Sequence, residues 1–342
     1  MVISEAFLLL LRAALKGQFS EDTTPLSSLG ETEWKGIATI ALEQSVSGLI
    51  GDAVTSIPEE TAIPDNILYY FISEKEKAAM KGRGMALLTK NVSSLFRENG
   101  LHPILMKGPA TAAYYPHPEL RSYGDIDLYF TKDEFDGARA LAAKESVVTD
   151  AGDGSFHFKM EGVDVDVHRS YFDLHMSDSD LPEISSPEAS IIMLSAHAMK
   201  HACGTGLGLR QICDVAMAFK YWEGRYDPDR LEAALRTSGM VKWQTLLSSF
   251  IINRLGIEVF CPGGRTISDI PLLKIVEEGG NFGHHASGRM EAFGKSTAKR
   301  KADTVKRFLK RLPFSLKYAP SETLRNVASL TVGNFKKKSV TL

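Results

Sequence analysis

The sequence has few cysteines and no long apolar run. Its 342 residues include three cysteines, Cys203, Cys213 and Cys261, and none of them forms a Cys-x-x-Cys pair. This excludes a disulfide framework and argues against a structural zinc site, so the cysteines favour a reducing compartment. No apolar stretch approaches the roughly 18 residues that a membrane-spanning helix needs. We therefore expect neither a secreted disulfide-rich protein nor a transmembrane one.

The N-terminus lacks the basic start that a signal peptide has. Ala6 to Leu11 is apolar, but Arg12 interrupts the run, so we expect a first helix over residues 5–16, capped by Ser4. The composition is 44% hydrophobic and 24% charged, with a net charge of −2. These values are ordinary for a globular protein, and the predicted location is the cytoplasm.

Two carboxylates stand two residues apart at the start of an apolar run. Asp125 and Asp127 lead into Leu128, Tyr129 and Phe130, which is typical of a buried strand. Residues i and i+2 of a strand share a face, so both carboxylates project together. A hard divalent cation such as Mg²⁺, or Mn²⁺ in its place, would relieve their repulsion. The same spacing also occurs in an edge strand that carries two solvated carboxylates.

Groups suited to phosphate lie on the N-terminal side of these carboxylates. The apolar run 103–106 ends in Lys107 and Gly108 and then enters a helical stretch, an arrangement that offers backbone N–H groups and an ammonium to a triphosphate. Arg121 offers a fork of donors, and Gly124 permits the close approach of a backbone or a phosphate. We expect these four residues, together with His168, to bind the nucleotide.

A third carboxylate is predicted on a neighbouring strand. Residues 163–169 alternate strictly, which places Asp164, Asp166 and His168 on one face and three valines on the other. A two-residue turn at 161–162 predicts a hairpin between strands 156–160 and 162–169, which would present Asp166 beside Asp125 and Asp127. Three carboxylates on adjacent strands suit a two-metal phosphoryl-transfer site. Asp164 or His168 is the candidate general base.

Together these motifs resemble those of the DNA-polymerase-β-type nucleotidyltransferase superfamily. The matching positions are Lys107-Gly108, Arg121-x-x-x-Asp125-Ile126-Asp127 and Asp166-Val167-His168. The pattern is most similar to the bacterial branch named only as nucleotidyltransferase family proteins, and it also resembles abortive-infection type toxin nucleotidyltransferases. Unlike the toxins, the chain has Tyr123 where they have serine, and Ser122 directly follows Arg121.

The resemblance implies transfer of a nucleoside monophosphate from an NTP to an acceptor hydroxyl, with release of pyrophosphate. Asp125, Asp127 and Asp166 would hold the metal ions. The acceptor, whether sugar, peptide, protein or RNA, is left open. Two alternatives are a toxin-like transferase acting on tRNA and a catalytically idle nucleotide-binding or antitoxin-like module.

The expected fold class is α+β, with a small mixed β-sheet core flanked by helical regions. The predicted division is an N-terminal helical region (1–100), a catalytic core (101–175) and a C-terminal helical domain with a basic tail (185–342). Within the core, a helix is expected over 132–145, begun by a capping box of Thr131 and Glu134. Strands are expected at 103–107, 126–130, 156–160 and 162–169.

The C-terminal region carries two further candidate features. His197 and His201 are four residues apart and share a helix face, so they and Lys200 either line the acceptor side of the site or are structural. No glutamate lies between the two histidines and no third ligand is nearby in the sequence, which argues against a zinc site. Residues 289–338 contain 14 Lys/Arg against 3 Asp/Glu, a segment that would contact RNA, an anionic membrane surface, or the acidic remainder of the chain itself.

Overall fold

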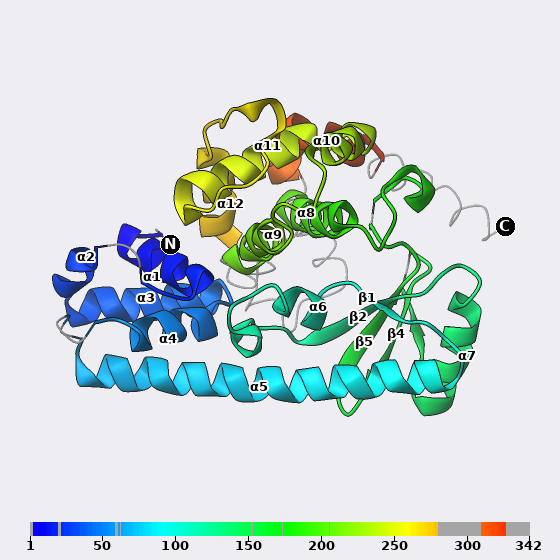
Figure 1. Cartoon of the computed structure of the whole chain (residues 1–342), viewed down its shortest axis with the longest axis horizontal. Coiled ribbons are helices and arrows are strands. Elements are labelled where there is room, and N and C mark those ends of the chain that lie inside the picture. The colour runs from blue at the N-terminus through cyan, green and yellow to red at the C-terminus, as the bar shows by residue number, and fades with distance from the viewer. Residues whose placement is uncertain are drawn as a thin grey trace. The chain divides into compact units, whose positions relative to one another are not determined.

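The described residues form one five-stranded sheet and helices that precede and follow it in the chain (Figure 1). The computed structural model describes residues 3–19, 22–58, 61, 63–151, 153–172, 174–204, 206–279 and 309–325. They divide into an N-terminal unit, Met1–Tyr171 with Ala216–Tyr221, and a C-terminal unit, Phe172–Val215 with Trp222–Leu342. This is the α+β class with flanking helical regions that the sequence predicts. The finer division at residue 100 stays a prediction.

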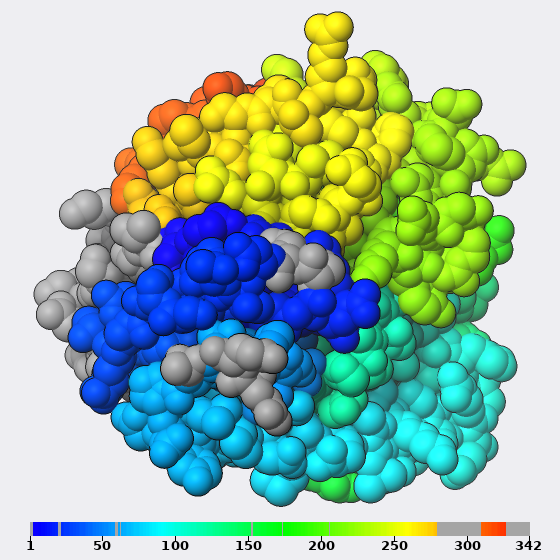
Figure 2. Space-filling model, turned by 60° about the vertical axis from the view of Figure 1, so that its left-hand side comes forward, coloured from blue at the N-terminus to red at the C-terminus, as the bar shows by residue number. Residues whose placement is uncertain are grey.

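Among the described residues of the N-terminal unit, five helices precede the sheet. They are α1 (Glu5–Lys16), α2 (Thr24–Ser27), α3 (Glu31–Glu43), α4 (Ser47–Thr55) and α5 (Asp65–Glu98). The predicted cap of α1 is confirmed, because the Phe7 N–H donates to Ser4 Oγ at 3.2 Å. On the face drawn in Figure 2, the N-terminal helices, in blue, form a continuous surface with α5, in light blue and cyan.

The long helix α5 supports the sheet with one side of its C-terminal half. Met85, Leu88, Val92 and Phe96 recur at helical spacing and pack into the same core as the apolar face of the sheet. Gly100, with φ 73°, follows the helix, and the Leu101 N–H donates to Phe96 O at 3.0 Å. This is the left-handed ending that glycine makes easy.

The sheet has the strand order β1-β2-β5-β4-β3. The strands are β1 (Ile104–Leu105), β2 (Asp125–Tyr129), β3 (Thr149–Asp150), β4 (Phe156–Met160) and β5 (Val163–His168). β2 and β5 are parallel and the other neighbours are antiparallel. The predicted hairpin is confirmed: Met160 pairs with Val163 across Glu161 and Gly162, whose φ values of 50° and 80° suit a tight hairpin turn.

Two details of the core differ from the sequence-based prediction. Helix α7 (Phe135–Glu145) begins later than expected, and the predicted capping box is wrong. Glu134 instead accepts from the His102 backbone N–H at 3.2 Å, and its Oε1 lies 2.6 Å from His102 Nδ1. The edge strand β3 was not predicted, because two exposed residues carry no alternating pattern.

The described part of the C-terminal unit is helical. Its helices include α8 (Pro187–Cys203), α10 (Pro228–Thr237), α11 (Val241–Phe250), the π-helix η3 (Ile251–Leu255) and α12 (Ile270–Gly279). Helix α9 (Leu209–Tyr221) contributes to both units. Ser186 caps the start of α8, since the Ala189 N–H donates to Ser186 Oγ at 3.1 Å. Of the basic segment 289–338, only residues 309–325 are described, and they are mainly helical. No helix in the described ranges has the length and apolar character needed to cross a membrane.

Close contacts at two glycines hold the loop that leads into β2. The short helix η1 (Pro118–Leu120) lies against α4 and α5. A Cβ at Gly48 of α4 would lie 2.6 Å from Leu120 O, and a Cβ at Gly82 of α5 would lie 2.2 Å from Glu119 O. The Tyr123 hydroxyl also donates to Gly82 O at 3.0 Å. Both glycines are therefore needed for the backbone to approach so closely.

We expect Gly82→Ala to destabilise the N-terminal unit by about 2–3 kcal/mol, because the added methyl overlaps the Glu119 backbone. Gly84→Ala is the matched control on the same helix. A Cβ there meets nothing within 4 Å, so the better helix propensity of alanine should stabilise by about 1 kcal/mol. Denaturant unfolding measures the change in unfolding free energy of each variant. Equal effects would contradict the close packing.

Candidate active site

The register of the sheet brings the predicted carboxylates together on one face. Asp125 pairs with Asp164 and Asp127 with Asp166 across the parallel strands β2 and β5. The intervening residues Ile126, Leu128, Val165 and Val167 are buried in the core on the opposite face. The alternation of strand residues thus separates an apolar face from a polar one, which carries the acidic positions of both strands.

Asp127 is buried and shared by two nitrogen groups. It is 6% exposed, its Oδ1 accepts from Lys107 Nζ at 3.1 Å, and His168 Nε2 lies 2.6 Å from the same oxygen. A carboxylate oxygen accepts, so Nε2 of His168 donates. Lys107 is also buried, directly after the Met106 N–H that donates to Asp127 O at 3.1 Å. The free-energy cost of burying this carboxylate is reduced because Lys107 and His168 compensate its negative charge.

Asp166 is perturbed by the same surroundings. Burial raises the pKa of its carboxyl above the ordinary value, and the negative charge of Asp127 raises it further, with a smaller contribution from Asp125. His168 acts in the opposite direction. Asp125, Asp127 and Asp166 are therefore close enough to interact electrostatically, as the spacing along the sequence predicts.

Other predicted nucleotide-binding residues lie around the start of β2. Gly108 has φ 56°, and a Cβ there would lie 3.3 Å from Asp125 O, so its lack of a side chain lets the loop before α6 (Pro109–Ala112) lie against the strand. A Cβ at Gly124 would meet nothing within 4 Å. Arg121 is 5% exposed, with its guanidinium carbon 5.7 Å from the centroid of the Tyr123 ring. The arginine is thus part of a buried cluster at the loop.

Asp164 differs in environment from the other three carboxylates. It is exposed, and its Oδ1 lies 3.1 Å from Lys159 Nζ across the hairpin. An exposed cross-strand pair of this kind is usual on a solvated strand face. This favours an ion pair for Asp164 over a role as a general base.

His157 is a residue of the polar face that the sequence analysis did not identify. His157 of β4 pairs with Asp166 of β5, so the transverse row across the sheet is Asp127, Asp166 and His157. The signal was present in Phe156-His157-Phe158, because two aromatic residues that enter the core leave the residue between them on the other face. The register needed to join it to Asp166 is not visible in the strand sequence alone.

The family comparison agrees with this arrangement. The family model described as "Uncharacterised nucleotidyltransferase" matches residues 30–248, more than half of the chain. The chain belongs to this family. No curated protein and no solved structure matches the chain. Membership in the nucleotidyltransferase family supports nucleotidyl transfer as the general reaction and an NTP as a substrate. The narrower resemblance to a polymerase-β or abortive-infection branch stays a prediction.

The side chains of this nucleotidyltransferase fit a divalent cation by their chemistry. Asp125, Asp127 and Asp166 supply the hard oxygen ligands that Mg²⁺ and Mn²⁺ prefer. Burial raises the pKa of Asp166, and the negative charges of Asp127 and Asp125 raise it further. Lys107 and His168 occupy Oδ1 of Asp127, where a cation would otherwise compensate the charge. As oriented, no group of three or more His, Cys, Asp or Glu side chains in the described ranges is arranged to hold a metal ion.

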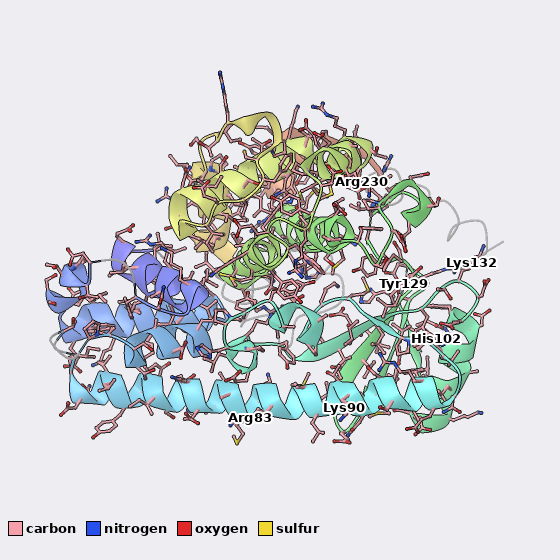
Figure 3. The ribbon with its side chains drawn as sticks, viewed as in Figure 1. Arg83, Lys90, His102, Tyr129, Lys132 and Arg230 are labelled. Atoms are coloured by element: carbon pink, nitrogen blue, oxygen red, sulfur yellow. The ribbon has the colours of Figure 1, made fainter. Side chains whose placement is uncertain are left out.

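Two other sets of basic residues lie elsewhere in the described part of the chain. His197 and His201 lie on α8 of the C-terminal unit with ring centroids 4.5 Å apart, edge to face, and Lys200 lies between them in sequence. Their role at the acceptor side stays a prediction. Arg83 and Lys90 lie on the exposed side of α5 (Figure 3). Because α5 packs on the apolar face of the sheet, they lie on the other side from the carboxylates.

A double-mutant cycle should show strong coupling between Lys107 and Asp127. Asp127→Asn leaves a buried ammonium beside a neutral amide, so we expect a loss of about 3–5 kcal/mol in unfolding free energy. The double variant Lys107→Met with Asp127→Asn should have an unfolding free energy about 2 kcal/mol or more above that of Asp127→Asn alone. The exposed pair Lys159–Asp164 is the control, with an expected coupling of at most about 1 kcal/mol. Additive effects at Lys107 and Asp127 would refute the compensation.

Proposed function

We propose that the protein transfers a nucleoside monophosphate from an NTP to the hydroxyl group of an acceptor and releases pyrophosphate. The observation that supports this most is the register of β2 and β5, which sets Asp127 beside Asp166 and keeps Asp125 on the same face. Two-metal phosphoryl transfer needs carboxylates gathered in this way. The family match supports the same general reaction.

In this proposal Asp125, Asp127 and Asp166 hold Mg²⁺ or Mn²⁺, which supplies Lewis acidity to phosphate oxygens and lowers the pKa of the acceptor hydroxyl. Lys107 brings a positive charge to the same carboxylate cluster and would neutralise part of the triphosphate charge. The Gly108 backbone and Arg121 would assist it. His168 holds Asp127 in place through the hydrogen bond from Nε2 to Oδ1.

The transfer itself exchanges one phosphorus–oxygen bond for another. The acceptor oxygen forms a bond to the α-phosphorus while the bond from that phosphorus to the bridging oxygen breaks, and pyrophosphate leaves with the bonding electrons. The proton of the hydroxyl passes to a base, for which Asp164 and His168 are the candidates. Asp164 pairs with Lys159, and Nε2 of His168 already carries the proton that it donates to Asp127, so His168 could accept the hydroxyl proton only at Nδ1.

The tRNA-directed alternative depends on the basic segment 289–338, most of which lies outside the described residues. It stays a prediction, as does the cytoplasmic location. The catalytically idle alternative is decided by the transfer experiment that follows.

A transfer assay with each α-³²P-labelled NTP and Mg²⁺ or Mn²⁺ should place label in one fraction of a cell extract separated into RNA, protein and small molecules. Asp125→Asn removes one negative charge from the proposed metal-binding group and should lower the transfer rate at least about 100-fold, which corresponds to about 2.7 kcal/mol of transition-state stabilisation. Asp133→Asn, an exposed change next to α7, should leave the rate unchanged.

Asp125→Asn at the wild-type rate would contradict the assigned role of this carboxylate. NTP binding by calorimetry, combined with no label in any fraction, would instead support the idle module. The fraction that carries label also identifies the acceptor class, so a label in RNA would support the tRNA-directed alternative.

Cation binding can be measured without turnover. We expect Mn²⁺ to bind the wild-type protein, and the free ion can be measured by electron paramagnetic resonance. Asp166→Asn should bind Mn²⁺ at least about tenfold more weakly, because one oxygen ligand and one negative charge are lost. Asp133→Asn should bind as the wild type does. Equal Mn²⁺ affinity of all three proteins would show that Asp166 does not belong to the metal site.

A further inference from the structure

His157 is a polar residue of the candidate site that no step of the proposed mechanism uses. It pairs with Asp166 in the register of β4 and β5, and the burial of Phe156 and Phe158 in the core directs it to the polar face. The charge of a protonated His157 is also one of the smaller influences that lower the pKa of Asp166. The ring is half-buried and makes no hydrogen bond or ion pair with any residue that the structure describes.

The ring nitrogens of His157 are not among the buried side-chain atoms without a partner in the described residues, so they are open to solvent. A neutral imidazole presents one donor and one acceptor on opposite sides of its ring. A group that enters the site can therefore donate to this ring or accept from it.

The local charge decides which group that is. Asp127 and Asp166 stand in the same transverse row, so an anionic phosphate placed at His157 would be repelled. A hydroxyl group is neutral and can either donate or accept. Its chemistry matches that of the acceptor in the proposed reaction.

We propose that His157 binds the hydroxyl group of a neutral, hydroxyl-bearing acceptor and holds it next to Asp166. This rests on the proposed function, because it assigns one side of the same site. It divides the polar face into a nucleotide side, with Lys107 and Gly108 before β2, and an acceptor side on β4. His157 then determines acceptor binding and has no part in NTP binding.

The test compares His157→Leu, which removes the hydrogen-bonding group, with His157→Gln, which keeps one. Transfer rates are measured against a dilution series of the extract fraction that accepts label, and separately against NTP. His157→Leu should raise the half-saturating amount of that fraction about tenfold while leaving the KM for NTP within about twofold. His157→Gln should restore acceptor saturation to within about threefold of the wild type. Asp133→Asn, an exposed change outside the polar face, should change neither value.

The outcomes separate this inference from the proposed function. If the wild type transfers no label, the proposed function fails and the inference fails with it. If the wild type transfers label and His157→Leu saturates with the acceptor fraction as the wild type does, only the inference is overturned. An equal rise in both half-saturation values would overturn it too. So would weaker Mn²⁺ binding by His157→Leu, which would make His157 a metal ligand. His157→Ala gives the same comparison if His157→Leu does not fold.

Discussion

The site depends on one electrostatic constraint, the placement of Asp127 beside Asp166 on parallel neighbouring strands. Two carboxylates in that position repel each other, and burial strengthens the repulsion by removing water. The folded chain meets this cost at Asp127 with Lys107, which precedes α6, and with His168 at the end of β5. Segments far apart in the sequence must therefore be in place together before the acidic row is stable.

The N-terminal helices contribute to the site by fixing the approach to β2. The loop before Asp125 passes η1, whose backbone is held close to α4 at Gly48 and to α5 at Gly82. The Tyr123 hydroxyl bonds to the α5 backbone from the same loop. Catalytic side chains need to be held to within about 0.5 Å of their working positions, and rigid support from packed backbone provides this better than a mobile loop. The helical layer thus has a function in positioning the site, although it contributes no catalytic group.

Sequence alone predicted those parts of the site that depend on local rules. The i,i+2 spacing of Asp125 and Asp127, the alternation around Asp166 and the two-residue turn at Glu161 all follow from strand geometry, and the structure has each of them. Helix α4 lies in the helical region predicted over 1–100, but its bounds were not predicted because seven of its nine residues are buried and the polar side of a periodic pattern is missing. The contact of Lys107 with Asp127, and the position of His157 beside Asp166, needed the order of strands in space. Roles in binding and catalysis stay predictions for all of these residues.

The charge of the polar face bears on how a nucleotide would enter. On β2, β4, β5 and the loop before α6, four carboxylates (Asp125, Asp127, Asp164 and Asp166) face two lysines, Lys107 and Lys159, so the face is negative when its histidines are neutral. A triphosphate is itself strongly anionic. Lys107, which is buried and already paired with Asp127, cannot offset both the charge of the triphosphate and that of the carboxylates. Basic residues of α5 cannot help, because that helix covers the opposite face of the sheet. NTP should therefore bind this face together with a divalent cation, and the paired state of Lys107 should change when it does.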